Sequence, residues 1–536
     1  MRTVCKKYGP YVLLGAIVLM LLFLNIFYQD HWLDSDMAAE MIFSRILSEE
    51  HHLIATQNWY YSTEFRVLYT QLVMVPLFKL LGNWHIIRLI ANMVFYGLML
   101  ASYFYFMKPL KISRTLTVLS ACILLLPFSE TMMTHMQMGN TYMSHVILVF
   151  LFFGMFLRLC GERKGKAGRF VLLVLYILLA AVCGISGVRY LLAVQCPLVL
   201  TAFFYAMGSG AFQNFRGEMS RENRKLLFRT PEMKYFLYSL LGAVCAIAGY
   251  GINVLWVSHR YVFQTYGATN FIALYEGILF ERIQNAVGCL LMLFGYIPDR
   301  GFLSLRGIVT MAAFVILGVF CYVTARNLKE EKREGFRVFV PLFLTVSFFL
   351  NLFVFIFTTS TMVPRYYITI MIFALPALCF YLEREKRAFD RMAVVGLLTV
   401  CLLLGTGKTV LSFMTVDKNE TKRPVAEFLL ENGYDFGFAT YNNANIITEL
   451  TNGAVEVGNV WDPRQLNYFL WSSPAKYYED DYHTGEVFLL LTAEECVNYA
   501  DAPALVNGEK IYEDGAYTVY LYENRDELMK FSLILF

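Results

Sequence analysis

Long apolar runs separated by short polar loops dominate the first 415 residues of the chain. A helix that crosses a bilayer needs about 20 apolar residues, because roughly 30 Å of hydrocarbon must be crossed at about 1.5 Å per residue. Eleven runs are predicted to be membrane-spanning helices, at 11–28, 88–107, 115–128, 141–159, 170–184, 190–208, 235–257, 307–325, 338–358, 366–382 and 392–415.

Two shorter apolar stretches, at 67–81 and 283–297, could either cross the membrane or lie flat on it. Positive charge decides between these alternatives, because Lys and Arg concentrate in cytoplasmic loops. If neither stretch crosses, the basic clusters all fall on one side, and the opposite loops hold only scattered arginines. We therefore predict interfacial or re-entrant helices on the outer face at both stretches. The N-terminus is then cytoplasmic, and two outer loops lie at 29–84 and 258–306.

Residues 416–536 lack such runs and alternate strand-like with helical segments. Strands are predicted at 436–440, 455–460, 487–492 and 517–522, and helices at 425–432 and 443–451. About 120 residues suffice for a separate core. The predicted fold is thus mainly α. It is a polytopic membrane helix bundle of about 11 transmembrane helices over 1–415, with outer interfacial helices and a small C-terminal α/β extracytoplasmic domain over 416–536.

Composition agrees with a membrane protein, since 57% of the residues are apolar or aromatic and only 16% are charged. The net charge of +3 is the sum of two opposite excesses. Residues 1–415 hold 37 basic and 21 acidic residues, whereas 416–536 hold 8 basic and 21 acidic ones. This balance argues against a nucleic-acid partner, which would need a concentrated basic surface. The apolar content also excludes a disordered chain.

The first outer loop carries the most informative acidic residues. Apolar residues from Met37 onward recur at helical spacing, so a helix is predicted to begin near Ser35 and to lie along the membrane surface. Asp36 and Glu40 share a face of this helix, and Asp34 stands at its N-terminal end. Such carboxylates could deprotonate a hydroxyl or hold a divalent cation. The alternative is structural, because Asp34 or Ser35 is also a suitable N-cap and acids favour a first helical turn.

Charged residues at the outer ends of the spans form a second candidate group. Glu64 lies in an aromatic-rich stretch of the first loop, where a carboxylate at membrane level needs a partner or a task. Arginines stand at the outer ends of three spans, in Arg189-Tyr190, Arg260 and Arg365-Tyr366. Guanidinium groups suit bidentate contact with phosphate, so these positions are candidate sites for a lipid phosphate. Snorkelling to lipid headgroups is the structural alternative.

Residues 10–110 resemble the GT-C superfamily of integral membrane glycosyltransferases. A first span is followed by an outer loop with an acidic pair and a helix at 34–40. A second interfacial helix then ends in Leu80-Leu81-Gly82, and the next span starts at Arg88. Within the superfamily, the chain looks most like the protein mannosyltransferase and aminoarabinose transferase branch. Arg189-Tyr190 and Arg365-Tyr366 give looser support, and the C-terminal domain is not a diagnostic match.

The resemblance implies that the acid opening the first outer loop, Asp34, is the catalytic carboxylate. Many family members have Asp-Glu there, whereas this chain has Asp34-Ser35-Asp36, so either Asp34 or Asp36 could take the central role. Family members use a polyprenyl-phosphate sugar, whose phosphate would be bound by Arg365 and Arg189, with Arg260 behind them. The remaining residues expected to bind substrate are Glu40, Glu64, Tyr190 and Tyr366.

The function implied is transfer of a sugar from a polyprenyl-phosphate donor to an acceptor hydroxyl on the extracytoplasmic face. We expect inversion at the anomeric carbon and a role in modifying cell-envelope glycans or glycoconjugates, in a bacterial cell membrane. The acceptor stays open, and the acids at Asp34 and Asp36 permit a divalent cation without requiring one. A transporter or lipid flippase of envelope glycolipids is the main alternative. It would place ionisable residues in mid-span, whereas the notable charges here lie at the outer edge.

Overall fold

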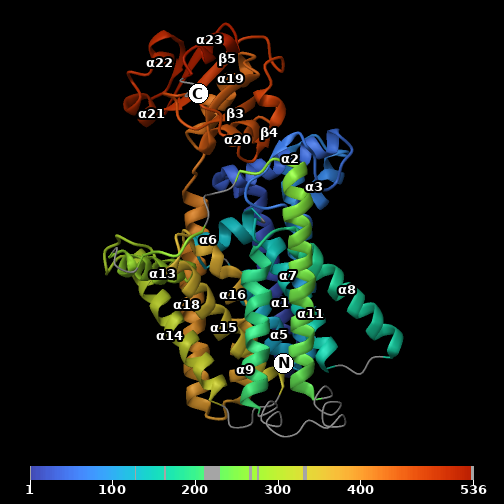
Figure 1. The fold of residues 1–536 in the computed structure, drawn as a ribbon. Helices are drawn as coiled ribbons and strands as arrows, with labels where there is room; N and C mark the ends of the chain where they lie inside the picture. Colours follow the sequence, from blue (N-terminus) through green and yellow to red (C-terminus); the bar gives the residue numbers. More distant parts are fainter. Residues whose placement is uncertain are drawn as a thin grey trace.

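The structure is a computed structural model that describes residues 2–126, 128–139, 141–161, 165–209, 230–264, 269–273, 277–329 and 335–532. It consists of a long helix bundle with a smaller mixed domain at one end (Figure 1). The marked N-terminus lies toward the opposite end of the bundle from that domain. Parts of the predicted inner loops (162–164, 210–229 and 330–334) and of the outer loop 258–306 (265–268 and 274–276) lie outside the described residues.

The bundle has the helices that the apolar runs predict. Within the described residues, nine helical stretches are long and apolar enough to cross a membrane, and two bent helix pairs raise the number to as many as eleven. The prediction of about 11 transmembrane helices is therefore confirmed. The bundle helices are α1 (Arg2–Tyr28), α4 (Trp84–Met107), α5 (Arg114–Leu125), α7 (Met143–Gly161), α8 (Lys166–Ile185), α9 (Cys196–Gly208), α11 (Pro231–Ile252), α14 (Leu305–Leu328), α15 (Phe336–Phe357), α16 (Ile368–Met371), α17 (Ala374–Arg384) and α18 (Ala388–Thr415).

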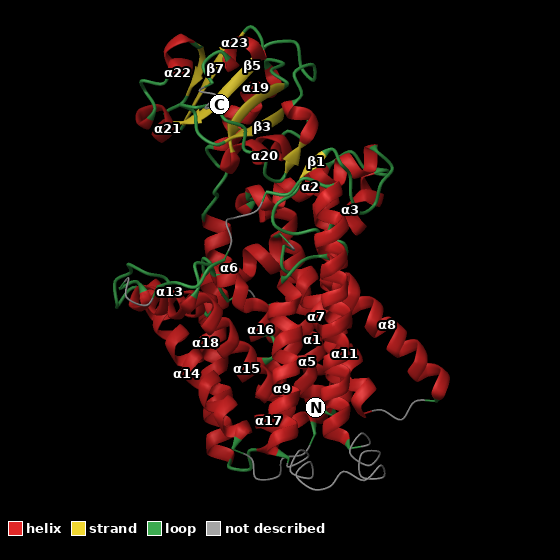
Figure 2. Ribbon diagram, viewed as in Figure 1, coloured by secondary structure: helices red, strands yellow, loops and turns green. Residues whose placement is uncertain are grey.

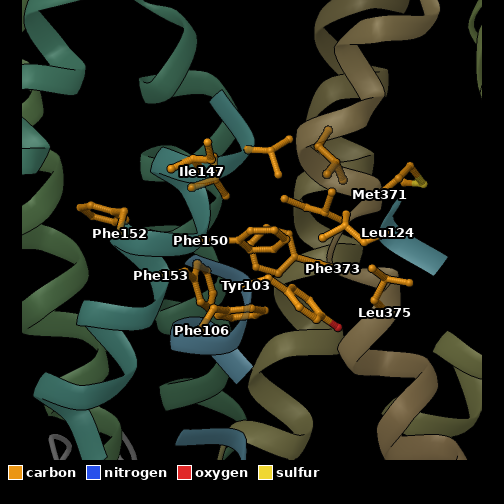
Figure 3. Packing of buried hydrophobic residues seen from close by; sticks show 14 of the residues in the cluster. Tyr103, Phe106, Leu124, Ile147, Phe150, Phe152, Phe153, Met371, Phe373 and Leu375 are labelled. Atoms are coloured by element: carbon orange, nitrogen blue, oxygen red, sulfur yellow. The ribbon is translucent and has the colours of Figure 1, made fainter. Parts of the chain in front are cut away.

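Aromatic side chains fill the centre of the bundle between α4, α7 and the α16–α17 region (Figure 3). Phe106 of α4 stacks on Phe150 of α7, with ring centroids 5.4 Å apart. Phe153, one turn further along α7, packs on Phe373 at 4.8 Å. Aromatic pairs of this kind add to the energy of burying their area. The core thus fixes α7 against the bent pair formed by Pro364–Met371 and Ala374–Arg384.

Two helix pairs of the bundle are bent. The pair Arg114–Leu125 and Glu130–Met138 bends by 93°, and the pair Pro364–Met371 and Ala374–Arg384 bends by 43°. In the first pair, α6 (Glu130–Met132) is followed by a π-helical segment, Met133–Met138. Local π-helical geometry is rare and is often found at functional sites.

Three helices of the outer loops do not cross the bundle. They are α2 (Ser35–Glu49), α3 (Gln71–Phe78) and α13 (Leu279–Leu293), and none is a candidate span. A helix of 8 residues, such as α3, or of 15, such as α13, is too short for the hydrocarbon core. The prediction that 67–81 and 283–297 are not spans agrees with this result.

The C-terminal domain over 416–536, named the outer domain after its predicted extracytoplasmic position, is built on a five-stranded sheet in the order β3-β2-β5-β7-β6 (Figure 2). The strands are β2 (Phe436–Thr440), β3 (Glu456–Val460), β5 (Val487–Thr492), β6 (Glu509–Glu513) and β7 (Tyr517–Tyr522). Strands β3, β2 and β5 are parallel, whereas β7 is antiparallel to both β5 and β6. The helices are α19 (Lys422–Glu431), α20 (Tyr441–Leu450), α21 (Ala493–Asn498), α22 (Pro503–Asn507) and α23 (Arg525–Met529).

The four predicted strands and both predicted helices of this domain are present, but β6 was missed. Its sequence, Glu509–Glu513, is charged, and most of its side chains are exposed or half-buried. It is an edge strand of the sheet, where charged side chains are common and no buried face imposes an apolar alternation.

Specific polar contacts hold the outer domain on the first outer loop. The short strand β1 (Trp59–Tyr60) pairs antiparallel with β4 (Ser473–Pro474). The backbone N–H of Trp84 donates to the side-chain oxygen of Asn452 at 2.9 Å. A buried ion pair joins Arg88 of α4 to Glu449 of α20 through two hydrogen bonds of 2.7 Å. The domain is therefore fastened at several points rather than tethered only by the chain.

Candidate functional site

A polar cavity of about 150 Å³ lies below α2, where the first outer loop, the bundle and the outer domain meet. It is lined by three carboxylates and three guanidinium groups, together with aromatic and hydroxyl side chains. The charged lining residues are Asp36, Glu40, Glu64, Arg66, Arg189 and Arg365. Most were predicted from the sequence, and the fold brings them together from four separate segments.

Helix α2 positions the two aspartates at its N-terminus. Asp34 is the N-cap, and its carboxylate accepts a hydrogen bond from the backbone N–H of Met37 at 2.9 Å. Burial, followed by the negative charge of Asp36, raises the pKa of Asp34 to about 6. Asp36 lies in the first turn and lines the cavity, where its carboxylate accepts a hydrogen bond from the hydroxyl of Tyr441 at 2.8 Å. The two acids thus differ in place: Asp36 lines the cavity, and Asp34 stands beside it.

Glu40 is buried one turn further along α2, and both of its carboxylate oxygens accept hydrogen bonds. It accepts hydrogen bonds from Tyr69 at 2.6 Å, from Arg66 at 2.9 Å and from Thr70 at 3.0 Å. Burial raises the pKa of Glu40 to about 7, against the opposing effects of Arg66 and the two hydroxyls. Since all these partners belong to one short segment, Glu40 fixes the residues 66–70 against α2.

Glu64 and Arg189 form the second charged pair of the cavity. The Nε of Arg189 donates to Glu64, and the guanidinium also lies over the ring of Tyr142 at 4.9 Å. Burial alone would raise the pKa of Glu64, but the charges of Arg189 and Arg66 lower it to about 2. Tyr190 is buried behind this pair and shares a hydrogen bond of 2.6 Å with His145. Glu64 is therefore an ionised residue that orients Arg189.

Ion pairing leaves one carboxylate and one guanidinium group of the cavity without an oppositely charged partner. Glu40 pairs with Arg66, and Glu64 pairs with Arg189. Among the described residues, neither Asp36 nor Arg365 has an oppositely charged side chain within 4.0 Å. A partly buried charge without a partner is costly, and at a cavity wall it indicates a role in binding or catalysis.

A larger groove, of about 930 Å³, opens beside the polar cavity. The residues that line both are Thr63, Glu64, Tyr142, Arg189, Arg365 and Tyr366. The rest of the groove includes apolar side chains from α15 and from the π-helical segment after Arg189, namely Leu192, Ala193, Leu350, Val354 and Phe355. The arginines therefore stand at the junction of a polar cavity and a partly apolar groove between helices.

Three predicted residues do not line the cavity. Asp34 stands beside it and Tyr190 is buried behind the Glu64–Arg189 pair, as described above. Arg260 is exposed at the end of α12 (Ser258–Arg260), where its backbone carbonyl accepts a hydrogen bond from the side-chain amide of Gln57 at 3.2 Å. In the described part of the chain, no group of three or more His, Cys, Asp or Glu side chains is arranged to hold a metal ion. The divalent cation stays a prediction.

Sequence reasoning missed the contribution of the outer domain to this site. Trp471 and Ser472 line the cavity, and Tyr441 contacts Asp36. No local signal marks these residues, because they reach the site only when the outer domain docks on α2. Arg66 and His135 also line the cavity. Both belong to predicted outer segments, and this position was the signal in the sequence that could have pointed to them.

No protein-family model matches the sequence, and no curated protein is significantly similar to it. Solved structures are similar in fold. ArnT from Cupriavidus metallidurans in the apo state has a TM-score of 0.55 at 11% identity, over 98% of this chain and 99% of that one. The same protein bound to undecaprenyl phosphate has 0.55 at 13% identity, over 96% and 98%.

A third similar structure is the oligosaccharyltransferase of Archaeoglobus fulgidus tethered with an acceptor peptide. Its TM-score is 0.50 at 12% identity, over 98% of this chain and 75% of that one. Both proteins are GT-C membrane glycosyltransferases. The similarity to ArnT extends over nearly the full length of both chains, including the outer domain. This chain therefore has the fold of the GT-C membrane glycosyltransferases, as the resemblance of residues 10–110 predicted.

Proposed function

We propose that this protein transfers a sugar from a polyprenyl-phosphate donor to an acceptor hydroxyl on the extracytoplasmic face of the membrane. One observation carries the proposal. A cavity at the outer end of the bundle holds an acid without an ionic partner, Asp36, and a guanidinium without one, Arg365, among the described residues. The reaction needs one group to accept a proton and another to hold a phosphate.

The groove would hold the donor. A polyprenyl chain is apolar and its phosphate is charged, so a fitting site has apolar walls that end at guanidinium groups. Leu192, Val354 and Phe355 supply such walls, and Arg189 and Arg365 stand at the end that joins the cavity. In the solved structures, an undecaprenyl phosphate is bound by ArnT, a protein of the same fold.

The carboxylate pair of α2 would supply the base. Asp36, with Asp34 beside it, takes the proton from the acceptor hydroxyl, and the oxygen attacks the anomeric carbon of the donor sugar. The bond from that carbon to the phosphate oxygen breaks, and the electron pair leaves with the lipid phosphate. Arg365 and Arg189 stabilise the negative charge that develops on this phosphate. Attack opposite to the leaving phosphate inverts the anomeric carbon, and modification of cell-envelope glycans in bacteria is the proposed role.

Arg365→Gln is expected to weaken the binding of undecaprenyl phosphate by about 10- to 100-fold. A hydrogen bond to a charged group contributes roughly 1.5–3 kcal/mol, and about 1.4 kcal/mol corresponds to a tenfold change. Native mass spectrometry of the purified protein, titrated with undecaprenyl phosphate, measures this change. Arg260→Gln is the matched control, because it removes an exposed outer arginine away from the cavity. Equal retention of the lipid by both variants would contradict the proposal.

Transfer activity is expected to rise as the pH increases through about 6. Burial and the charge of Asp36 raise the pKa of Asp34 to about 6, so below this pH Asp34 is protonated and the pair keeps only one of the two negative charges that attract the acceptor proton. The measurement is kcat/KM between roughly pH 5 and 8. Asp34→Asn should remove this acidic limb, whereas a wild-type profile that stays flat across the range would rule out a contribution of the Asp34 charge to the reaction.

A further inference from the structure

A separate pocket, of about 490 Å³, lies in the outer domain at the carboxyl ends of its parallel strands. Residues that end or follow β2, β3 and β5 line it, including Asn442, Trp461 and Thr492. From β2 the chain continues to β3 on one side, whereas β5 lies on the other side of β2. The crevice between β2 and β5 is thus a topological switch point, where open α/β sheets bind their ligands.

The side chains of this outer pocket can bind hydroxyl-rich molecules. They are amides, hydroxyls and carboxylates, such as Asn442, Asn498 and Glu494, around the indole of Trp461. Trp461 is 64% exposed, which is unusual for so large an apolar group. A flat aromatic face surrounded by donors and acceptors fits a sugar ring, whose C–H faces pack on the indole while its hydroxyls bind the polar groups.

A row of aromatic rings leads from the outer pocket to the polar cavity below α2. The rings of Trp461 and Phe469 are 4.7 Å apart, and those of Phe469 and Trp471 are parallel at 6.0 Å. Trp461 lines the outer pocket and Trp471 lines the polar cavity. The row therefore connects a site at the switch point with the site that holds Asp36.

Two buried asparagines hold the end of this row in place. The amide of Asn459 donates to the carbonyl of Trp471 at 3.0 Å, and that of Asn445 donates to the carbonyl of Ser472 at 3.4 Å. Ser472 has a φ of +46°, a left-handed conformation that a residue with a side chain rarely adopts. Such a conformation persists only where its surroundings enforce it, and it is typical of functional sites.

The acidic character of the outer domain and of its pocket narrows the class of ligand that the pocket can bind. Residues 416–536 contain 8 basic and 21 acidic residues, and the outer pocket itself carries Glu494 and Glu495 against Lys422. This distribution disfavours an anionic polymer and is compatible with a neutral one.

We propose that the outer pocket and the row Trp461–Phe469–Trp471 bind the acceptor, a neutral oligosaccharide, and direct its terminal hydroxyl toward Asp36. This inference rests on the proposed function for the identity of the site it feeds. The outer pocket binds the inner sugars of the acceptor, the aromatic row packs on those that follow, and the last ring enters the cavity. Trp461 and Trp471 are binding residues in this scheme, and Asn445 and Asn459 are positioning residues.

The test uses the full chain in detergent and three neutral probes: chitotetraose, maltotetraose and mannotetraose. Saturation-transfer NMR and calorimetry are expected to detect binding of at least one probe. Trp461→Ala should weaken that binding by about tenfold, the effect of losing one aromatic contact, and Trp471→Ala should weaken it similarly. Val506→Ala is the control, because it removes an exposed apolar side chain of the same domain that does not line the outer pocket.

Two measurements separate this inference from the proposed function. If the wild type retains undecaprenyl phosphate but binds none of the three probes, the acceptor site is refuted and the donor site stands. Equal probe affinity of wild type, Trp461→Ala and Trp471→Ala refutes it as well. Probe binding that depends on Trp461, in a protein that retains no lipid phosphate, would support the saccharide site while the proposed function fails.

Discussion

Replacing Asp36 by asparagine is expected to lower the rate of sugar transfer by about 10²- to 10⁴-fold, the usual contribution of a general base. Asparagine keeps the size of the side chain but cannot accept the proton of the acceptor hydroxyl. The contact from Tyr441 can persist, because the asparagine carbonyl also accepts a hydrogen bond. The measurement is the transfer of sugar from a polyprenyl-phosphate donor by purified protein.

The design of this experiment separates chemistry from folding and from donor binding. Asp481→Asn is the control, since it neutralises an exposed acid of the outer domain that does not line the cavity. Asp36→Asn should still retain undecaprenyl phosphate, because the donor phosphate is assigned to Arg189 and Arg365. A stably inserted Asp34→Asn, Asp36→Asn double variant that transfers sugar at the wild-type rate would refute the mechanism.

Removing one partner of the buried pair Arg88–Glu449 should weaken the attachment of the outer domain by about 3–5 kcal/mol, the cost of leaving a buried charge unpaired. The side chain of Arg88 is 1% exposed and that of Glu449 is 6% exposed. Burial raises the pKa of Glu449 to about 7 despite the charge of Arg88, which shows how strongly this position disfavours an isolated carboxylate. Hydrogen exchange in α2 and α20 should therefore become much faster in Arg88→Met.

A double variant tests the cause of this effect. Arg88→Met combined with Glu449→Leu leaves no unpaired charge, so its exchange rates should be closer to those of the wild type than either single variant. Arg464→Met is the matched control, because Arg464 pairs with Asp501 on the surface of the same domain. Exchange that stays unchanged in Arg88→Met would show that the other contacts alone hold the domain.

Such a weakening would also affect the site. Tyr441 and Trp471 reach the cavity only from the outer domain, so a loosened domain removes the partner of Asp36 and one wall of the cavity. We expect Arg88→Met to lower transfer although Arg88 itself contacts no substrate in the proposed scheme.

The candidate site divides into residues that the sequence revealed and residues that it could not. Asp36, Glu40 and Glu64 were visible because a carboxylate in an outer loop at membrane level is uncommon and invites an explanation. The sequence did not reveal which of these acids lacks an ionic partner. Glu40 and Glu64 are both neutralised by arginines, and this pairing depends on how α2, the segment after it and the turn at Arg189 approach one another.

The sequence by itself determined the membrane spans, the two interfacial stretches and most strands of the outer domain. These features depend on the composition and periodicity of about 20 neighbouring residues, because these local properties determine which face of a segment is buried. Only the tertiary structure decided how the site is completed. Asp36 and Tyr441 are 405 residues apart, and Arg88 and Glu449 are 361 apart. Their contacts arise from the docking of one domain on another, and no local pattern encodes such an encounter.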